Sequence, residues 1–268
     1  MTNDTIVPQP AVAAPVATTA SDDLGIDRAF LMQMARLPFI AAALVLLVWF
    51  SHHLWSSLAS PDSPLRNLGP LVVLCAGMVL AAVIDGVAFK VPNWLTLSLV
   101  LSGWVLGLLH TLNVPVDSGQ GGIGSALLGT LVGFGLLFPM LAIGGMGQGD
   151  VKMQMGFGAW VGAFFPSREA AWIVLWAFCL GAIIGGVFGL VMMAIRRQFH
   201  KNARNFGEIL TDLRVMVTIG PGAAAERANQ RRKEWVRLPY GVPLCVGFVG
   251  YLWYLYLAGS SVLFVGNG

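Results

Sequence analysis

Charged side chains are scarce in this sequence. Asp, Glu, Lys and Arg together make up 11% of its 268 residues, whereas the hydrophobic types make up 56%. A soluble protein of this length covers its surface with many more charges. The composition therefore argues against a soluble globular protein and predicts an integral membrane protein.

Cysteine and histidine are also rare, with three and four residues respectively. Cys75, Cys179 and Cys245 each lie within an apolar run, and none belongs to a Cys-x-x-Cys pair. This pattern predicts neither a zinc knuckle nor a disulfide framework, so we expect no metal and no cofactor. The net charge of +3 is too small to suggest a nucleic-acid partner.

The N-terminal residues 1–25 are rich in Pro, Ala and Thr and have no helical apolar period. Such a composition predicts a disordered tail, which we expect to extend to residue 36. The tail lacks the positive segment and the adjoining apolar core of a cleaved signal peptide. The first apolar segment is therefore expected to act as an uncleaved membrane anchor.

Seven apolar segments follow, most of them near the ~20 residues needed to cross a hydrocarbon core of ~30 Å. They are 38–56, 70–89, 94–112, 121–144, 151–166, 170–195 and 240–265. The fifth is short and rich in glycine, so a half-buried or broken helix is an alternative for it. The expected fold is an all-α polytopic membrane protein with about seven transmembrane helices.

The basic residues are distributed unevenly between the segments. If the N-terminus is cytoplasmic and all seven segments cross, only Arg66 and Arg168 of the 16 basic residues lie outside. Lys and Arg concentrate on the cytoplasmic side of membrane proteins, so this count predicts a cytoplasmic N-terminus and an external C-terminus. After the tail we expect an extra helix with an external loop (37–69) and a membrane domain (70–265). The domain carries the basic loop 196–239 on its cytoplasmic side.

Two acidic residues lie at membrane depth, and this topology brings both to the cytoplasmic face. Asp85 is near the end of the second segment, and Asp150 is at the start of the fifth. An ionised Asp at the centre of a membrane helix costs about 2.5–3.5 kcal/mol. Either residue alone can be explained as a helix cap or as the partner of Lys90 or Lys152. Both on one face favour a functional site.

Two carboxyl groups brought together in a partly dry site share one proton, because both cannot be ionised at low cost. One can then activate water while the other protonates a peptide carbonyl, as in aspartic proteases. Gly147 and Gly149, just before Asp150, permit backbone conformations closed to other residues and a close approach of a substrate strand. A phosphate-binding loop is excluded here, because no GK[ST] ending is present and an acid would repel phosphate.

Three stretches resemble the prepilin peptidases, the bacterial branch of the GxGD membrane aspartic proteases. DGVAFKVPNWLT (85–96) resembles the family segment in which an aspartate precedes Ile-Pro-Asn and Leu-Thr at a fixed distance. GMGQGDVK (145–152) resembles the motif GMGxGDxK, and LPYGVP (238–243) resembles the Pro-Tyr-Gly entry to the last helix. Val91 replaces the usual Ile, and Pro243 stands where Ala is usual.

This resemblance implies that Asp85 and Asp150 are the catalytic pair. It also implies supporting roles in the active site for five residues of the first two stretches, namely Pro92, Asn93, Gly147, Gly149 and Lys152. The implied partners are type IV pilin-like precursors in the bacterial inner membrane, whose basic leader is cleaved at the cytoplasmic face.

The shorter family group that serves tight-adherence or Flp-type pili resembles this chain best. Larger members carry a cytoplasmic domain between their first two helices and also methylate the new N-terminus. Here the gap of about 57–69 is short, so methyltransferase activity is not expected. Two rival interpretations remain, a proton-coupled transporter that uses the acids as a relay and a catalytically silent protein of pilus or secretion assembly.

Overall fold

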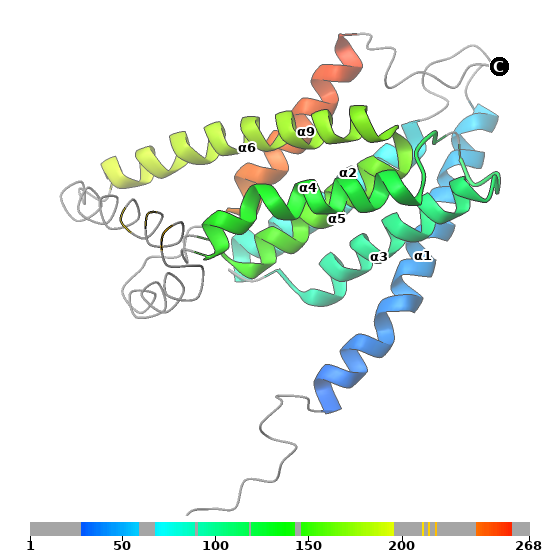
Figure 1. The fold of residues 1–268 in the computed structure, drawn as a ribbon, viewed down its shortest axis with the longest axis horizontal. Coiled ribbons are helices and arrows are strands. Elements are labelled where there is room, and N and C mark those ends of the chain that lie inside the picture. Colours follow the sequence, from blue (N-terminus) through cyan, green and yellow to red (C-terminus); the bar gives the residue numbers. More distant parts are fainter. Residues whose placement is uncertain are drawn as a thin grey trace, which may run out of the picture.

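The computed structural model describes residues 28–58, 68–88, 91–117, 119–142, 146–195 and 240–258, together with the single residues 211, 214 and 218. Within these ranges the chain is helical and contains no strand. The helices are α1 (Arg28–Leu58), α2 (Leu68–Ala88), α3 (Asn93–Thr111), α4 (Ile123–Ala142), α5 (Gln148–Phe164), α6 (Ser167–Ile195) and α9 (Gly241–Leu257) (Figure 1). Each predicted apolar segment thus corresponds to one helix.

Five of these helices are long and apolar enough to span a membrane, namely α1, α2, α3, α4 and α6. The helices α5 and α9 are shorter, with 17 residues each. The prediction of an all-α polytopic membrane protein is therefore confirmed. The predicted basic loop 196–239 lies outside the described residues, apart from the three single positions.

The first helix starts earlier than expected. The predicted tail reached residue 36, but α1 begins at Arg28, so residues 28–36 are helical. The reason is local: this stretch, RAFLMQMAR, consists almost entirely of residues with good helix propensity. Helix α1 contacts only α2 and α3 closely and lies at the margin of the bundle (Figure 1).

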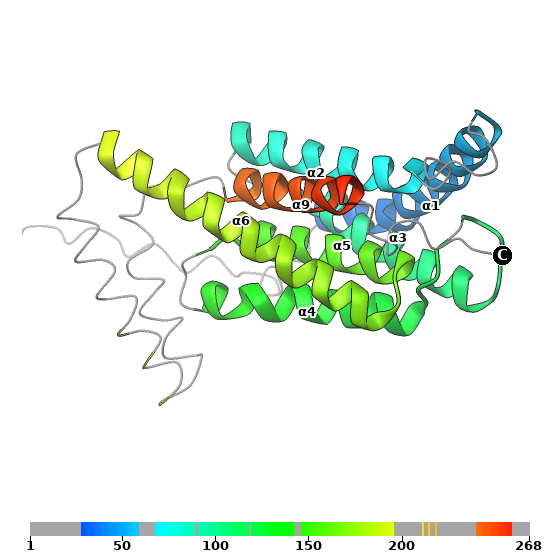
Figure 2. The same ribbon diagram turned by 90° about the horizontal axis from the view of Figure 1, so that it is seen from above.

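Helix α5 is the centre of the bundle, not a broken or half-buried element. Thirteen of its 17 residues are buried, and it contacts α3 and α4 most extensively (Figure 2). Trp160 donates a hydrogen bond from its indole Nε1 to the carbonyl of Leu99 at 2.9 Å. Phe157 stacks on Phe248 of α9, with ring centroids 4.1 Å apart. A helix surrounded by protein in this way needs neither the length nor the hydropathy of one that faces lipid.

Glycine allows the backbones of α4 and α5 to touch. A Cβ atom at Gly129 would clash with the carbonyl oxygen of Gly158, and one at Gly133 would lie 2.6 Å from that of Gln154. Any side chain at these two α4 positions would therefore separate the helices. Close contact of this kind is typical of small residues at four-residue spacing in membrane bundles.

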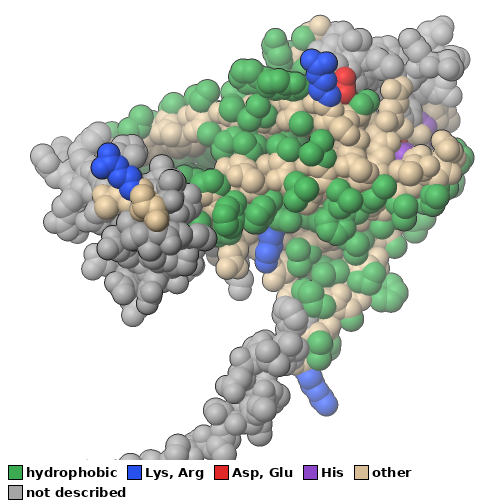
Figure 3. All heavy atoms as spheres, viewed as in Figure 1, with side chains coloured by type: hydrophobic (Ala, Val, Ile, Leu, Met, Phe, Trp, Pro, Cys, Tyr) green, Lys and Arg blue, Asp and Glu red, His purple; other side chains and the backbone are tan. Residues whose placement is uncertain are grey.

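The surface of the bundle is largely apolar. Large hydrophobic side chains are exposed on the outer helices, for example Phe39 (77%), Val83 (56%), Ile183 (66%) and Trp253 (61%). Hydrophobic atoms cover most of the described face in Figure 3, and charged side chains are few there. Such a surface fits hydrocarbon and would aggregate in water.

The end of the bundle opposite to the two aspartates is closed by the turn after α3. His110 lies 3.0 Å from Asp117 through its Nε2 atom, and both side chains are almost fully buried. The Nδ1 atom of the same ring lies 2.7 Å from the carbonyl oxygen of Ala163 in α5. This His–Asp pair ties the turn to two helices, and we assign it a structural role.

Candidate active site

Asp85 lies in the last turn of α2, and its side chain is buried against the start of α9. The residue is 6% exposed. Its Oδ2 atom accepts a hydrogen bond of 2.9 Å from the backbone N–H of Gly241. Because Gly241 is the first residue of α9, this N–H has no partner within its own helix and is free to bind the carboxylate. The first turn of α9 therefore fixes the position of Asp85.

Gly241 is a site residue whose role the sequence alone did not assign, although it belongs to the LPYGVP stretch. A Cβ atom at this position would lie 2.7 Å from Oδ2 of Asp85 and 3.1 Å from its Cγ. No side chain fits there unless Asp85 moves. The requirement for glycine follows from contact with the carboxylate and not from an unusual backbone conformation.

Asp150 is the third residue of α5 and caps the same helix. Its Oδ2 atom accepts a hydrogen bond of 3.2 Å from the backbone N–H of Gly147, the N-cap residue. This is one half of a capping box. The reciprocal bond needs a side chain at the N-cap, which glycine lacks. Asp150 therefore caps α5, as the structural alternative predicted, and it also lies at the candidate site.

The two aspartates lie at the same end of the bundle. Both are 6% exposed, and Asp85 in the last turn of α2 and Asp150 in the first turn of α5 are on helices that contact each other. Each uses Oδ2 for its hydrogen bond to a glycine. No hydrogen bond to Oδ1 of either residue is recorded within the described part of the chain. Oδ1 of each carboxyl group is thus available to react.

Lys152 does not pair with either aspartate. Its Nζ atom donates a hydrogen bond of 2.8 Å to Oδ1 of Asn93, the first residue of α3. Among the described residues, the one recorded ion pair is that of His110 and Asp117. The alternative in which Lys152 neutralises an aspartate is therefore wrong. The alternative with Lys90 concerns a residue outside the described ranges.

The turn before α3 packs against the first turn of α5. A Cβ atom at Gly149 would lie 3.2 Å from Cβ of Val91 and 3.4 Å from its backbone nitrogen. Pro92 is the N-cap of α3, and its carbonyl oxygen accepts hydrogen bonds from the N–H groups of Leu95 and Thr96. Together with the Lys152–Asn93 bond, this contact joins the two motif segments into one unit.

The prediction that Gly147 needs a backbone conformation closed to other residues is wrong. Gly147 has φ −79° and ψ 150°, an extended conformation that other residues adopt readily. Its Cβ would lie 3.2 Å from Oδ2 of Asp150, so a side chain is restricted by the carboxylate. Gly149 is restricted by Val91 in a similar way. Close packing, and not backbone freedom, explains these two glycines.

Tyr240 completes the described surroundings of the pair. It precedes Gly241 directly at the entry to α9, and its side chain is partly buried. The resemblance pointed to this stretch by its Pro-Tyr-Gly sequence without giving the tyrosine a role.

Comparisons with known proteins find similar proteins for this chain. Residues 72–190 match the model of the type IV leader peptidase family. This segment contains both aspartates and all five supporting residues. Two curated relatives are similar to the chain, and both are described as prepilin leader peptidase/N-methyltransferase. The first, from Aeromonas salmonicida (strain A449), is 30% identical over 151 residues, which are 53% of this chain and 46% of the relative.

The second, from Aeromonas hydrophila, is 30% identical over 176 residues, which are 56% of this chain and 57% of the relative. The chain thus spans about half the length of the curated relatives it matches. No solved structure matches it.

The fold and the site therefore define a polytopic helical membrane protein with two buried aspartates at one end of its bundle. Residues 72–190 are similar to the type IV leader peptidase family, and the predicted resemblance to the prepilin peptidases is confirmed.

Proposed function

We propose that this protein is a membrane aspartic endopeptidase that cleaves the basic leader from type IV pilin-like precursors. One observation carries the proposal: Asp85 and Asp150, from helices far apart in the sequence that contact each other, are both buried at the same end of the bundle. A family match that includes both residues supports it. Burying two acidic side chains at one end of a membrane bundle costs free energy, and a purely structural role for both residues does not explain that cost.

The chemistry follows from the arrangement of the carboxyl groups. With one proton shared between them, the ionised aspartate accepts a proton from a water molecule, and the oxygen of that water attacks the scissile carbonyl carbon. The protonated aspartate gives its proton to the carbonyl oxygen. Collapse of the tetrahedral intermediate then breaks the C–N bond: the aspartate that took the proton from water gives it to the leaving amine, and the other aspartate takes back a proton from a hydroxyl group of the intermediate. The Gly241 and Gly147 N–H groups hold Oδ2 of each residue and leave Oδ1 facing the reaction.

The supporting residues have positioning roles in this proposal. The bond from Lys152 to Asn93 holds the start of α5 against the start of α3, and Pro92 fixes the first turn of α3. The contact of Gly149 with Val91 serves the same purpose. These residues therefore act on catalysis by fixing where Asp150 lies.

The proposed membrane orientation places this site at the cytoplasmic face. The asymmetry of basic residues supports it, because fourteen of the 16 lie on the side where the aspartates are. A basic leader on the cytoplasmic side, attached to an apolar helix in the bilayer, would reach the pair from the same side. We further propose that the chain has peptidase activity without the N-methyltransferase activity in its relatives' names, since only residues 59–67 separate α1 from α2.

Co-expression with candidate precursors tests the proposal. The full chain is produced with a pilin-like precursor, and the mass of the precursor is measured. We expect a mass loss equal to the leader and no added methyl group. A proton-coupled transporter would change ion flux and leave the precursor intact. A silent assembly protein would change neither quantity, and either result would contradict the peptidase assignment.

A further inference from the structure

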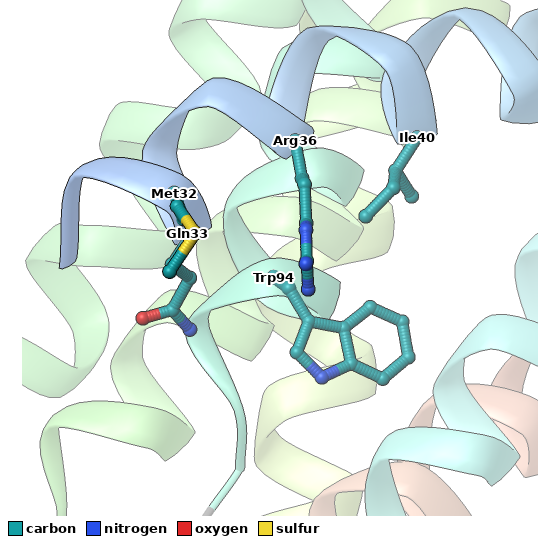
Figure 4. A pocket seen from close by; sticks show the side chains of 5 residues that line it. All are labelled: Met32, Gln33, Arg36, Ile40 and Trp94. Carbon is teal, nitrogen blue, oxygen red and sulfur yellow. The ribbon is translucent and has the colours of Figure 1, made fainter. Parts of the chain in front are cut away.

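A groove outside the aspartate site lies between α1 and the first turn of α3. It has a volume of about 480 Å³ and is lined by Met32, Gln33, Arg36, Ile40 and Trp94. Met32, Arg36 and Ile40 are spaced four residues apart, so they lie on one face of α1. Figure 4 shows Arg36 and Ile40 pointing from α1 into the space beside Trp94.

The chemistry of this groove is unusual for the surface on which it lies. Its walls are apolar and aromatic, and it holds one permanent positive charge, the guanidinium of Arg36. No ion pair of Arg36 is recorded in the described part of the chain. Arg36 and Trp94 are both exposed. The cation is therefore available to a ligand that brings a negative charge and an apolar part together.

The groove is at the same end of the bundle as the aspartates, because Trp94 follows Asn93, the partner of Lys152. In the proposed orientation this end faces the cytoplasmic leaflet. Tryptophan and basic residues gather at that depth, where anionic lipids are present and attract them. A soluble acidic ligand would gain little from Met32 and Ile40, whereas a lipid acyl chain would cover them.

We propose that this groove binds one anionic phospholipid. The phosphate contacts Arg36, the Gln33 amide lies beside the head group, and an acyl chain runs along Ile40 next to the Trp94 ring. Helix α1 packs on α2 and α3, and the lipid lies in the groove beside its contact with α3. This role is separate from the proposed peptidase reaction and does not depend on it.

Native mass spectrometry of the purified full chain, titrated with phosphatidylglycerol, tests this proposal. We expect Arg36→Gln to weaken binding about five-fold, the factor that about 1 kcal/mol for one basic residue represents. The matched control is Arg28→Gln, which removes the same charge from α1 outside the groove and should change binding less than two-fold. Arg36→Lys, which keeps the charge, should retain the preference for phosphatidylglycerol over phosphatidylcholine.

Four results would overturn the proposal. Equal weakening by Arg36→Gln and Arg28→Gln would show general attraction of charge to the surface. If Arg36→Gln weakens the binding of phosphatidylcholine as much as that of phosphatidylglycerol, the head-group charge has no role. Displacement of the lipid by millimolar inorganic phosphate would reveal a site for a bare anion. If Arg36→Gln instead raises the KM for the precursor equally in phosphatidylcholine and phosphatidylglycerol vesicles, the groove belongs to the protein substrate.

Discussion

The backbone N–H of Gly241 donates a hydrogen bond of 2.9 Å to Oδ2 of Asp85, although 156 residues separate the two in the sequence. This bond joins the end of α2 to the start of α9. It fixes the orientation of one carboxyl group at the point where the second, on Asp150, approaches from α5. The last helix of the bundle is thus part of the candidate active site.

Gly241→Ala should therefore inactivate the protein without unfolding it. The new Cβ would lie 2.7 Å from Oδ2 of Asp85, and displacement of a catalytic group by about 1 Å can cost ~100-fold in rate. Cleavage of the precursor is measured together with the amount of folded protein in the membrane. Gly186→Ala on α6 is the control, because a Cβ there meets nothing within 4 Å. Equal activity of the two variants would refute the role of Gly241.

Loss of the bond between Lys152 and Asn93 should weaken activity partly. A hydrogen bond to a charged group is worth about 1.5–3 kcal/mol, so Lys152→Met should lower the cleavage rate at least roughly ten-fold. Asn93→Leu should have a similar effect. The double variant should be little worse than either single one, because both remove the same contact. Additive losses would mean that Lys152 and Asn93 act on separate parts of the reaction.

Gln154 presents a different kind of prediction, which concerns stability. Its side chain is fully buried one turn after Asp150, and neither amide atom has a recorded hydrogen-bond partner. An unsatisfied buried polar group costs about 1–3 kcal/mol. Gln154→Met keeps the shape of the side chain beside Gly133 and removes the polar atoms. We expect the unfolding temperature in detergent to rise, and a fall would indicate that the amide has a partner in the folded protein.

The proposed topology predicts opposite locations for the basic loop and the C-terminus. Reporter fusions within residues 200–235 should give a cytoplasmic signal, and fusions after Gly268 should give an external one. The reason is the retention of Lys and Arg on the cytoplasmic side. Signals from the same side would show that α9 does not cross the membrane, which would contradict the proposed seven crossings.

Much of this arrangement could be predicted from local sequence. Apolar length located the seven helices, and the rarity of acids at membrane depth singled out Asp85 and Asp150. The spacing of the motifs then related them to a known family. These signals lie within single segments, so they require no knowledge of how the segments pack.

The features that were missed depend on contacts between segments. The partner of Lys152 proved to be Asn93 and not an aspartate, since the direction of a lysine side chain is set by which helices meet. The roles of Gly241 and Gly147 arise from carboxylates that lie beside them, and the sequence does not show which side chain lies beside a glycine in the fold. The central position of α5 could not be predicted from apolar length, because a helix enclosed by protein does not need high hydropathy.

The central claim is that Asp85 and Asp150 act as one catalytic unit, and their replacement by Asn tests it most directly. Each change keeps the size of the side chain and removes the carboxyl group that titrates. Cleavage of a co-expressed precursor is measured for Asp85→Asn, Asp150→Asn and the double variant, with the amount of protein in the membrane as a control. We predict that each single variant loses at least about 1000-fold in rate and that the double variant is scarcely worse, because members of a unit are not additive. Cleavage at the wild-type rate by either single variant would contradict the account.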